Sequence, residues 1–418
     1  MHSIVRQLNP ARFFLLGILL LAPLRPAVAR AEENPFPLLP GLENAVEFWK
    51  LVFTRYVANE VIFHDAQDPL KIYKVVQASE REDLRRLIKQ ETPGIAAAEG
   101  VEPGQLKIRA QRGVKERFVS GLALSRRYLD QMQQIFREEG APVDLTYLPL
   151  VESSFEITAR SRVGALGMWQ FMPVTGKKFM RVGPTLDERR DPLESSRAAA
   201  KFLKQNYEAL GSWPLAITAY NHGREGMLRA STAVGSTDLA VIVKNYDSAT
   251  FGFASKNFYA EFLAAVEIAK TSEKYFPGLD FHPPLALEEF TVERATTIST
   301  LLQRAGIPHA EFLAWNPALT AKVRDIPAGY RVKAPGDKIE ALAAAYRKPA
   351  QPVAVAKAKP AAPTTSAISW ILHHVVPGDT LWDLAKNYRV TVAAIQTANN
   401  LSNGHRLAVG QQLRIPKG

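Results

Sequence analysis

The sequence has no cysteine anywhere in its 418 residues. Disulfide bonds, thiolate catalysis and attachment of a lipid through a cysteine are therefore all excluded. A chain without disulfides is typical of a reducing compartment. Because the N-terminus carries an export pattern, the missing cysteines here exclude a lipoprotein rather than an exported protein.

Long apolar runs are scarce as well. The run from Phe13 to Leu24 is shorter than the ~20 residues that a membrane-spanning helix needs. It follows two arginines and precedes small residues at 27–29, so the pattern predicts a secretory signal peptide over residues 1–31. The alternative is a segment that is not cleaved and holds the protein at a membrane.

Positive charge is in excess, and metal-ligand patterns are missing. The formal charge is +11 and the pI about 9.6, which suits an acidic partner such as nucleic acid, an anionic membrane or an acidic wall polymer. The basic residues are scattered without a nucleic-acid-binding motif, so we expect no nucleic acid partner. His64 and Asp65 have no further ligand at metal-binding spacing, so we expect no metal and no cofactor.

Apolar residues at helical spacing dominate the middle of the chain. The pattern predicts helices over residues 42–58, 104–139, 193–210, 213–220 and 257–275. Two short apolar stretches, at 61–63 and 72–76, lie in an N-terminal region that spans 32–110. We therefore expect a mainly α fold.

The composition changes near the C-terminus. Residues 346–370 are rich in Ala, Pro, Lys and Thr and form no apolar helical face, which predicts a linker. A compact tail over 371–417 follows, with the pattern strand, helix, helix, strand. Its apolar residues are enough for a small core of its own.

A weak internal repeat flanks the linker. Four positions match at one constant spacing: Leu301 with Leu384, Ile307 with Val390, Asn316 with Asn399 and Val332 with Ile415. Such common residues also match by chance, but a shared spacing favours two copies of one small βααβ unit. The first copy would cover residues 287–336.

One stretch, LPLVESSFEITARSRVGALGMWQFMP, places a single carboxylate, Glu152, after an apolar run and before two serines. Burial among apolar neighbours disfavours charge and raises the pKa of a carboxyl, so that it can act as a general acid near neutral pH. The glycine-rich turn at 164–167 would let the backbone approach a ligand. By itself, however, a glutamate at this place is more often structural.

Other carboxylates compete for a role beside Glu152. Glu156 is the rival partner for a mechanism with two carboxylates, because it would lie on the same helix face if the helix continued. Glu225, Asp187 and Asp191 are expected to be solvated surface charges.

Three motifs in order carry a family resemblance: Glu-Ser at 152–153, Gly-Met-Trp-Gln at 167–170 and Ala-Tyr-Asn at 219–221. On a helical background they resemble the SLT catalytic domain of the lytic transglycosylases of family 1, and in particular its type D variant. The resemblance covers roughly residues 40–280. It implies a goose-lysozyme-like fold, with the catalytic domain over 111–280.

The same resemblance implies site residues by position. Glu152 would be the sole catalytic acid, and Ser153 would orient it or the substrate. The substrate-binding residues implied are Ser153, Met168, Gln170, Tyr220 and Asn221. The chain departs from many relatives at Glu156-Ile157, where Asn-Pro is common.

The tail, HVVPGDTLWDLAKNYRVTVAAIQTANN, resembles a LysM domain. LysM domains bind glycan that contains N-acetylglucosamine, and the resemblance implies a groove with Gly378, Asp379 and Thr380 on one side and Asn403 to Arg406 on the other. The copy at 287–336 is similar to a degenerate LysM, because it lacks the Pro-Gly-Asp-Thr turn.

Together the resemblances imply cleavage of the β-1,4 bond between N-acetylmuramic acid and N-acetylglucosamine in peptidoglycan. Glu152 would act first as acid and then as base, without water, and leave 1,6-anhydro ends. The alternatives are a hydrolytic muramidase of the same fold and a wall-binding protein without catalysis. We expect a periplasmic monomer associated with the cell wall.

Overall fold

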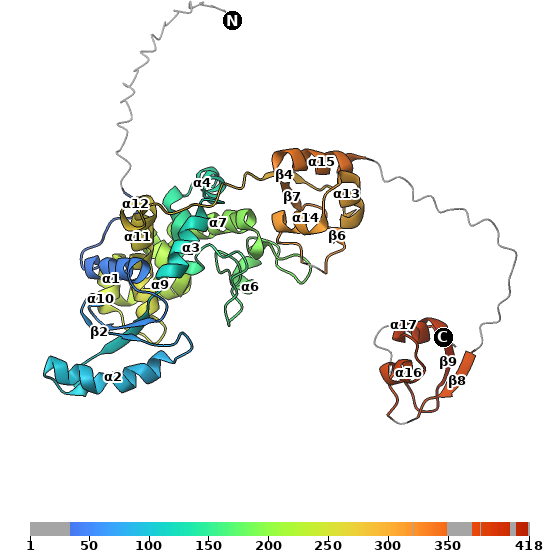
Figure 1. The fold of residues 1–418 in the computed structure, drawn as a ribbon, viewed down its shortest axis with the longest axis horizontal. Helices are drawn as coiled ribbons and strands as arrows, with labels where there is room; N and C mark the ends of the chain where they lie inside the picture. The colour runs from blue at the N-terminus through green and yellow to red at the C-terminus, as the bar shows by residue number, and fades with distance from the viewer. Residues whose placement is uncertain (1–33, 321, 349–369, 377, 402–406, 417–418) are drawn as a thin grey trace, which may run out of the picture. The chain divides into compact units, whose positions relative to one another are not determined.

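The computed structural model describes residues 34–320, 322–348, 370–376, 378–401 and 407–416. The predicted signal peptide, nearly all of the predicted linker and Asn403 lie outside these residues. The chain forms two compact units, one ending at Arg347 and the other beginning at Lys348. The fold is mainly α, as predicted, with seventeen α-helices and a few small sheets in the described part (Figure 1). None of the described helices is long and apolar enough to span a membrane.

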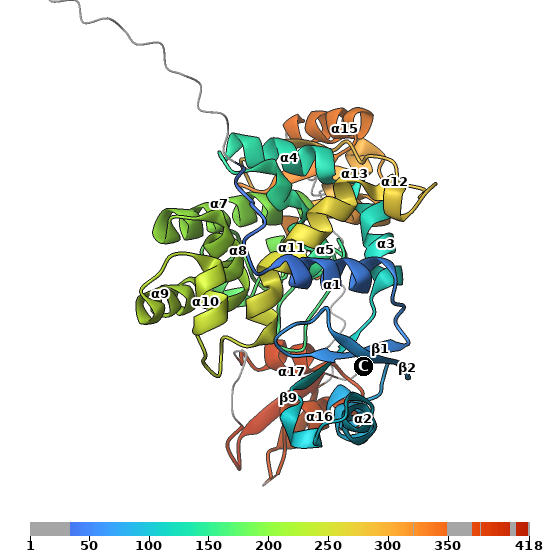
Figure 2. The same ribbon diagram turned by 90° about the vertical axis from the view of Figure 1, so that its left-hand side faces the viewer.

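The first unit opens with a helix and a small sheet. Its elements are α1 (Glu43–Thr54), β1 (Glu60–Asp65), β2 (Ile72–Gln77), α2 (Leu84–Glu99) and β3 (Ile108–Arg112). The two short apolar stretches of the sequence are β1 and β2, and the sheet has the order β2-β1-β3 with antiparallel pairing. Figure 2 shows α1 lying across the long helix α11 (Phe253–Lys270).

A helical body follows. Its helices are α3 (Lys115–Ser125), α4 (Leu129–Glu138), α5 (Leu148–Glu152), α6 (Pro173–Gly176), α7 (Pro192–Leu210), α8 (Trp213–His222), α9 (Arg224–Val234), α10 (Leu239–Asn245), α11 and α12 (Ser272–Tyr275). The single helical pattern over 104–139 is thus two helices. Pro142 precedes a 3-10 helix, Val143–Tyr147, and α5 follows it. Helices α7 and α11 bury apolar faces in the core that holds α5 in place.

The last part of the first unit is a small module that we call the first module. It consists of β4 (Glu288–Thr291), β5 (Thr296–Thr297), α13 (Ile298–Ala305), α14 (His309–Trp315), β6 (Asp325–Ile326), β7 (Arg331–Ala334) and α15 (Gly336–Arg347). It packs on the start of α7 (Figure 1). Lys333 is 1% exposed and lies 2.9 Å from Glu194 and 3.1 Å from Asp191.

The second unit is the predicted strand, helix, helix, strand. It consists of β8 (Trp370–His374), α16 (Leu381–Asn387), α17 (Val392–Ala398) and β9 (Gln412–Pro416), with β8 and β9 antiparallel. Val375, Leu384, Ile395, Leu413 and Ile415 form its core. The predicted apolar set therefore packs together.

Both modules contain the same asparagine clasp. The Asn316 amide donates to the Lys333 carbonyl at 2.8 Å and its oxygen accepts from the Lys333 N–H at 2.9 Å. Asn399 makes both bonds to Arg414, each 2.7 Å long. The clasp makes Lys333 equivalent to Arg414, so Val332 corresponds to Leu413 and the predicted match with Ile415 is wrong by two residues.

Candidate active site

Glu152 is the last residue of α5. The next residues cannot continue a helix, because Ser154 and Phe155 have φ of 55° and 60°, in the left-handed region. The condition for Glu156 to share a helix face with Glu152, that the helix continues, is therefore not met. Buried Ser153 fixes the turn by donating its hydroxyl to the Met168 carbonyl at 2.7 Å.

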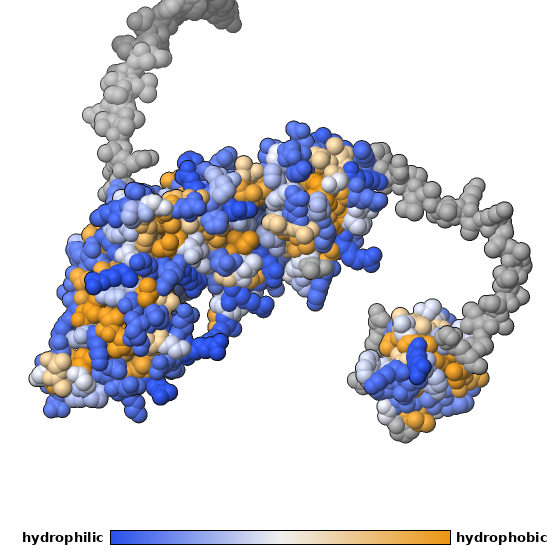
Figure 3. Space-filling model, viewed as in Figure 1, coloured by the Kyte–Doolittle hydropathy of each residue, from blue (hydrophilic) through white to orange (hydrophobic). Residues whose placement is uncertain are grey.

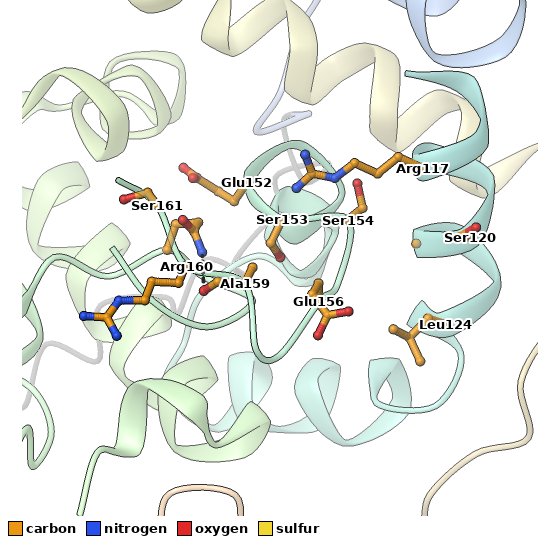
Figure 4. A pocket seen from close by; sticks show the side chains of 12 residues that line it. Arg117, Ser120, Leu124, Glu152, Ser153, Ser154, Glu156, Ala159, Arg160 and Ser161 are labelled. Carbon is orange, nitrogen blue, oxygen red and sulfur yellow. Dashed lines mark hydrogen bonds between the residues drawn. The ribbon is translucent and has the colours of Figure 1, made fainter. Parts of the chain in front are cut away.

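A cavity of about 610 Å³ opens beside Glu152 (Figure 4). It is lined by Arg117, Ser120, Gly121, Leu124, Glu152, Ser153, Ser154, Glu156, Ala159, Arg160, Ser161 and Gln170. Helix α3 forms one wall and sends the Arg117 side chain toward the serines (Figure 4). Gly121 permits this close approach, since an added Cβ would lie 2.6 Å from the Ser154 carbonyl oxygen.

The two carboxylates of this cavity have opposite electrostatics. Burial raises the pKa of Glu152 to about 8. The Thr158 hydroxyl, which donates to Glu156 at 2.6 Å, instead lowers the pKa of Glu156 below its ordinary value. Carboxyls whose pKa values are pushed apart are suited to different roles. Glu152 can therefore hold a proton at neutral pH, whereas the exposed Glu156 is ionised.

A third carboxylate, Glu261 on α11, was missed by the sequence reasoning. Burial, and then the nearby charge of Glu152, raise its pKa to about 8. The signal was present in NFYAEFLAAVEIA, where Glu261 is the one acidic residue inside the run 258–266. A charge in an otherwise apolar helix segment is a candidate for a site.

Tyr220 and Asn221 come from the end of α8. The Tyr220 hydroxyl donates to the Trp169 carbonyl at 2.8 Å. Burial and the charge of Glu152 raise the pKa of Tyr220 well above its usual value, so it stays a neutral donor. Asn221 accepts a hydrogen bond from Ser255 at 3.1 Å. Tyr220 thus lies near Glu152, while Asn221 is tied to the start of α11.

The two apolar side chains of the Gly-Met-Trp-Gln motif lie in the core rather than in the cavity. Met168 is 1% exposed and Trp169 is fully buried, so neither side chain lines the cavity. The Trp169 indole donates to Ser196 at 2.9 Å. Gln170 does line the cavity, but its amide donates to the carbonyls of Gly167 at 2.7 Å and Ala159 at 3.2 Å. Only its oxygen is left for a ligand.

The turn that carries this motif is held from behind by Arg189. The Arg189 guanidinium donates to the carbonyls of Gly164 and Phe171, each at 3.0 Å. Gly167 has φ of 81°, and an added Cβ would overlap the Arg189 carbonyl oxygen. Only glycine fits at this position.

The expectation that Asp187 and Asp191 are solvated is wrong. Asp187 is 8% exposed and forms a two-bond pair with Arg189, and Asp191 is fully buried beside Lys333. Their cationic partners stabilise them in the interior. Glu225 is exposed, as expected.

The second unit places three of the four predicted glycan-binding residues, Gly378, Asp379 and Thr380, at one loop, and Asn403 lies outside the described residues. Asp379 accepts hydrogen bonds from His373 at 2.8 Å and from the Val376 N–H at 2.9 Å, so it shapes the loop itself. Thr380 caps α16 by accepting from the Asp383 N–H at 3.1 Å, and Gly378 has φ of 97°. In the described residues, no group of His, Cys, Asp and Glu is arranged to hold a metal.

Comparison with known proteins identifies both domains. The Transglycosylase SLT domain family matches residues 133–242, and the LysM domain family matches residues 373–416. The chain is 27% identical over 291 residues to "Membrane-bound lytic murein transglycosylase D" of Escherichia coli, covering 68% of this chain and 62% of that protein. It is 28% identical over 162 residues to a "Putative tributyltin chloride resistance protein" of an Alteromonas species, covering 38% of this chain and 76% of that protein. The chain thus spans 62% of the length of the Escherichia coli relative.

Proposed function

We propose that this chain, with its transglycosylase SLT domain and its LysM domain, is a peptidoglycan lytic transglycosylase with Glu152 as its catalytic residue. The observation that carries the proposal is the environment of Glu152. It lines a cavity of about 610 Å³, and burial raises its pKa to about 8. A carboxyl that keeps its proton at neutral pH is the group required to protonate a glycosidic oxygen.

The proposed reaction uses Glu152 twice. As an acid it protonates the oxygen between N-acetylmuramic acid and N-acetylglucosamine, while the substrate's own acetamido group stabilises the developing cation. As a carboxylate it then accepts the proton of the C6 hydroxyl, which attacks C1 and forms the 1,6-anhydro sugar. Each proton that leaves Glu152 returns to it, so no second carboxylate is required.

The neighbours of Glu152 support these two roles. Tyr220 lies close enough for the charge of Glu152 to affect its pKa, and its hydroxyl donates to the Trp169 carbonyl, so a negative charge formed on Glu152 faces a neutral phenol rather than a phenolate. Ser153 and the Met168 carbonyl fix the end of α5 from which the side chain projects. Gln170 offers its amide oxygen to a sugar hydroxyl or amide.

We assign substrate retention to the second unit. A LysM domain that holds a glycan strand keeps the catalytic unit near its substrate and raises the effective concentration without new catalytic contacts. Gly378, Asp379, Thr380 and Asn403 remain the proposed groove. We place the protein in the periplasm at the cell wall. Retention at a membrane, which the name of the relative states for that protein, would here depend on residues 1–31.

Product analysis of digested sacculi by mass spectrometry tests the proposal. The expected products end in 1,6-anhydromuramic acid, whereas a muramidase of the same fold would leave reducing ends. Glu152→Gln should lower the rate by about 10²- to 10⁴-fold, because an amide cannot donate the proton. Glu156→Gln is the matched control and should cleave almost normally. Equal loss in both variants, together with reducing ends, would favour the hydrolytic alternative.

A further inference from the structure

The two βααβ modules present one equivalent surface in two different states. The asparagine clasps align Lys333 of β7 with Arg414 of β9. The strand registers agree, because Lys333 lies opposite Glu289 and Arg414 lies opposite Leu372. Both side chains point away from the module's own core. Lys333 contacts Asp191 and Glu194, which lie outside its module, and exposed Arg414 lies between buried Leu413 and Ile415.

In the first module this outward sheet face is occupied, and its occupant is acidic. Lys333 is held by Asp191 and Glu194. Arg331, on the same face, forms a two-bond pair with Glu194. Burial acts against the charge of Lys333, but these carboxylates raise its pKa above its ordinary value. The face therefore binds a pair of carboxylates.

In the second unit the equivalent face is open. Trp370 is 41% exposed and Leu372 is 56% exposed, and Arg414 is exposed beside them. No hydrogen bond or ion pair of the Arg414 side chain is found among the described residues. Hydrophobic residues reach the surface of this unit on the side where β8 runs (Figure 3). The face combines an aromatic plane, an aliphatic side chain and an unpaired cation.

We propose that the outward face of β8 and β9, made of Trp370, Leu372 and Arg414, binds the carboxylate-bearing peptide stems of peptidoglycan. The proposal rests on the proposed function and adds a peptide subsite to the glycan groove. Arg414 would pair with a stem carboxylate, as Lys333 pairs with carboxylates in the first module. Trp370 and Leu372 would pack against the small apolar side chains of the stem.

The size of the face favours a short peptide over a folded protein. Strands β8 and β9 have five residues each, so each is about 17 Å long and the pair about 10 Å wide. That gives on the order of 170 Å², whereas a stable protein interface needs about 800 Å² from each partner. The face is also near the proposed groove in the chain, because the loop that carries Gly378, Asp379 and Thr380 follows soon after the end of β8 at His374.

Binding of the full-length chain to peptidoglycan strands tests the proposal. Glu152→Gln is present in every protein, so that the polymer is not cleaved. Soluble glycan strands are immobilised on a sensor, before and after an amidase has removed their peptide stems. We expect about tenfold tighter binding to the strands that carry stems, because the stem brings both a carboxylate for Arg414 and apolar side chains for Trp370, whereas the amidase leaves on the sugar only a short lactyl carboxylate. Arg414→Gln and Trp370→Ala should each remove most of this preference.

Another exposed tryptophan in the same unit, which lies beside a lysine, supplies the matched control. Trp382 is 64% exposed, and the Lys386 ammonium lies 5.3 Å from its ring centre, on α16 rather than on the sheet. Trp382→Ala and Lys386→Gln should change binding to both kinds of strand by the same factor. Unchanged binding of chitin oligosaccharides reports that Arg414→Gln and Trp370→Ala still fold.

If the chain with an unmodified face binds strands with and without stems equally tightly, the proposal of a peptide subsite is wrong. So would a preference for stems that survives both Arg414→Gln and Trp370→Ala, which would leave the face to a protein partner. A chain that binds neither kind of strand would refute wall binding itself, and so the proposed role of the whole second unit.

Discussion

Replacing Glu152 by Gln should lower the rate of cleavage by about 10²- to 10⁴-fold and, at alkaline pH, stabilise the fold. Burial raises the pKa of Glu152 from 4.5 to about 8. Between these pH values the folded protein keeps a proton that the unfolded chain has lost. The free energy of unfolding therefore falls as pH rises through this window and levels off above about pH 8. A neutral amide of nearly the same shape does not pay this electrostatic cost.

The size of the effect follows from the pKa. At about 1.4 kcal/mol for each pH unit, the rise from 4.5 to about 8 corresponds to an upper limit of about 5 kcal/mol. The carboxyl opens onto a solvent-filled cavity, and water there reduces the cost of its charge, so we expect about 2–3 kcal/mol. The difference between Glu152→Gln and the unmodified protein should be near zero at about pH 5 and reach its full value at about pH 9.

Urea unfolding at both pH values, followed by tryptophan fluorescence, measures this difference. Trp169 is a suitable reporter, because it is buried and stacked on Phe136 at 5.6 Å beside the site. Glu156→Gln is the control of opposite sign. The Thr158 hydroxyl lowers the pKa of Glu156, so its contribution is present above the unfolded pKa and lost on acidification. If Glu152→Gln is no more stable than the unmodified protein at about pH 9, the burial argument for its pKa is wrong.

Three further results are expected. Cleavage of soluble muropeptides by the unmodified enzyme should decline as pH rises through about 8, where Glu152 loses its proton, and a pH–rate profile that stays flat to about pH 9.5 would contradict this. Lys333→Ala should lower the free energy of unfolding by about 3–5 kcal/mol, since it leaves Asp191 buried without its cation and Glu194 with Arg331 alone; Lys333→Met at acidic pH, measured by the same urea titration, should recover part of the loss. Deleting residues 369–418 should slow digestion of insoluble sacculi, followed by turbidity, much more than cleavage of short soluble fragments, and equal slowing would show that the tail supports the catalytic unit itself.

Much of the fold could be predicted because the relevant signals are local. The helical spacing of apolar residues located α1, α7, α8 and α11 to within a few residues, and the order of the tail elements was predicted as strand, helix, helix, strand. Boundaries were less certain where a pattern ran through a break. The pattern over 104–139 is continuous in sequence, yet the chain turns between α3 and α4 while the apolar residues of both helices face one core.

The repeat shows why the residue-by-residue alignment of two copies is harder to predict than the existence of a repeat. Strand residues alternate between the two faces, so a shift of two residues keeps every apolar residue on the same face. Val332 therefore matches Ile415 as well as Leu413 by pattern alone. The hydrogen bonds that the Asn316 and Asn399 side chains make to the backbone distinguish the two alignments, and the sequence pattern does not show these bonds.

The candidate site was only partly predictable, because burial depends on distant segments. Nothing near Asp191 in the sequence indicates that Lys333 will lie beside it. The Gly-Met-Trp-Gln motif likewise does not indicate that the Met168 side chain points into the core. Glu261 was within reach of the sequence, since an acidic residue in an apolar helix segment requires an explanation.

The ion pairs between the start of α7 and β7 determine where the chain can be truncated without exposing buried charges. The family match ends at residue 242, and the helical body ends at Tyr275, so either would suggest a catalytic fragment without the first module. Such a fragment would lack the cations of β7, and it would expose two carboxylates, Asp191 and Glu194, without their partners. A fragment intended for kinetics or crystallisation should instead run through Arg347, where the first compact unit ends.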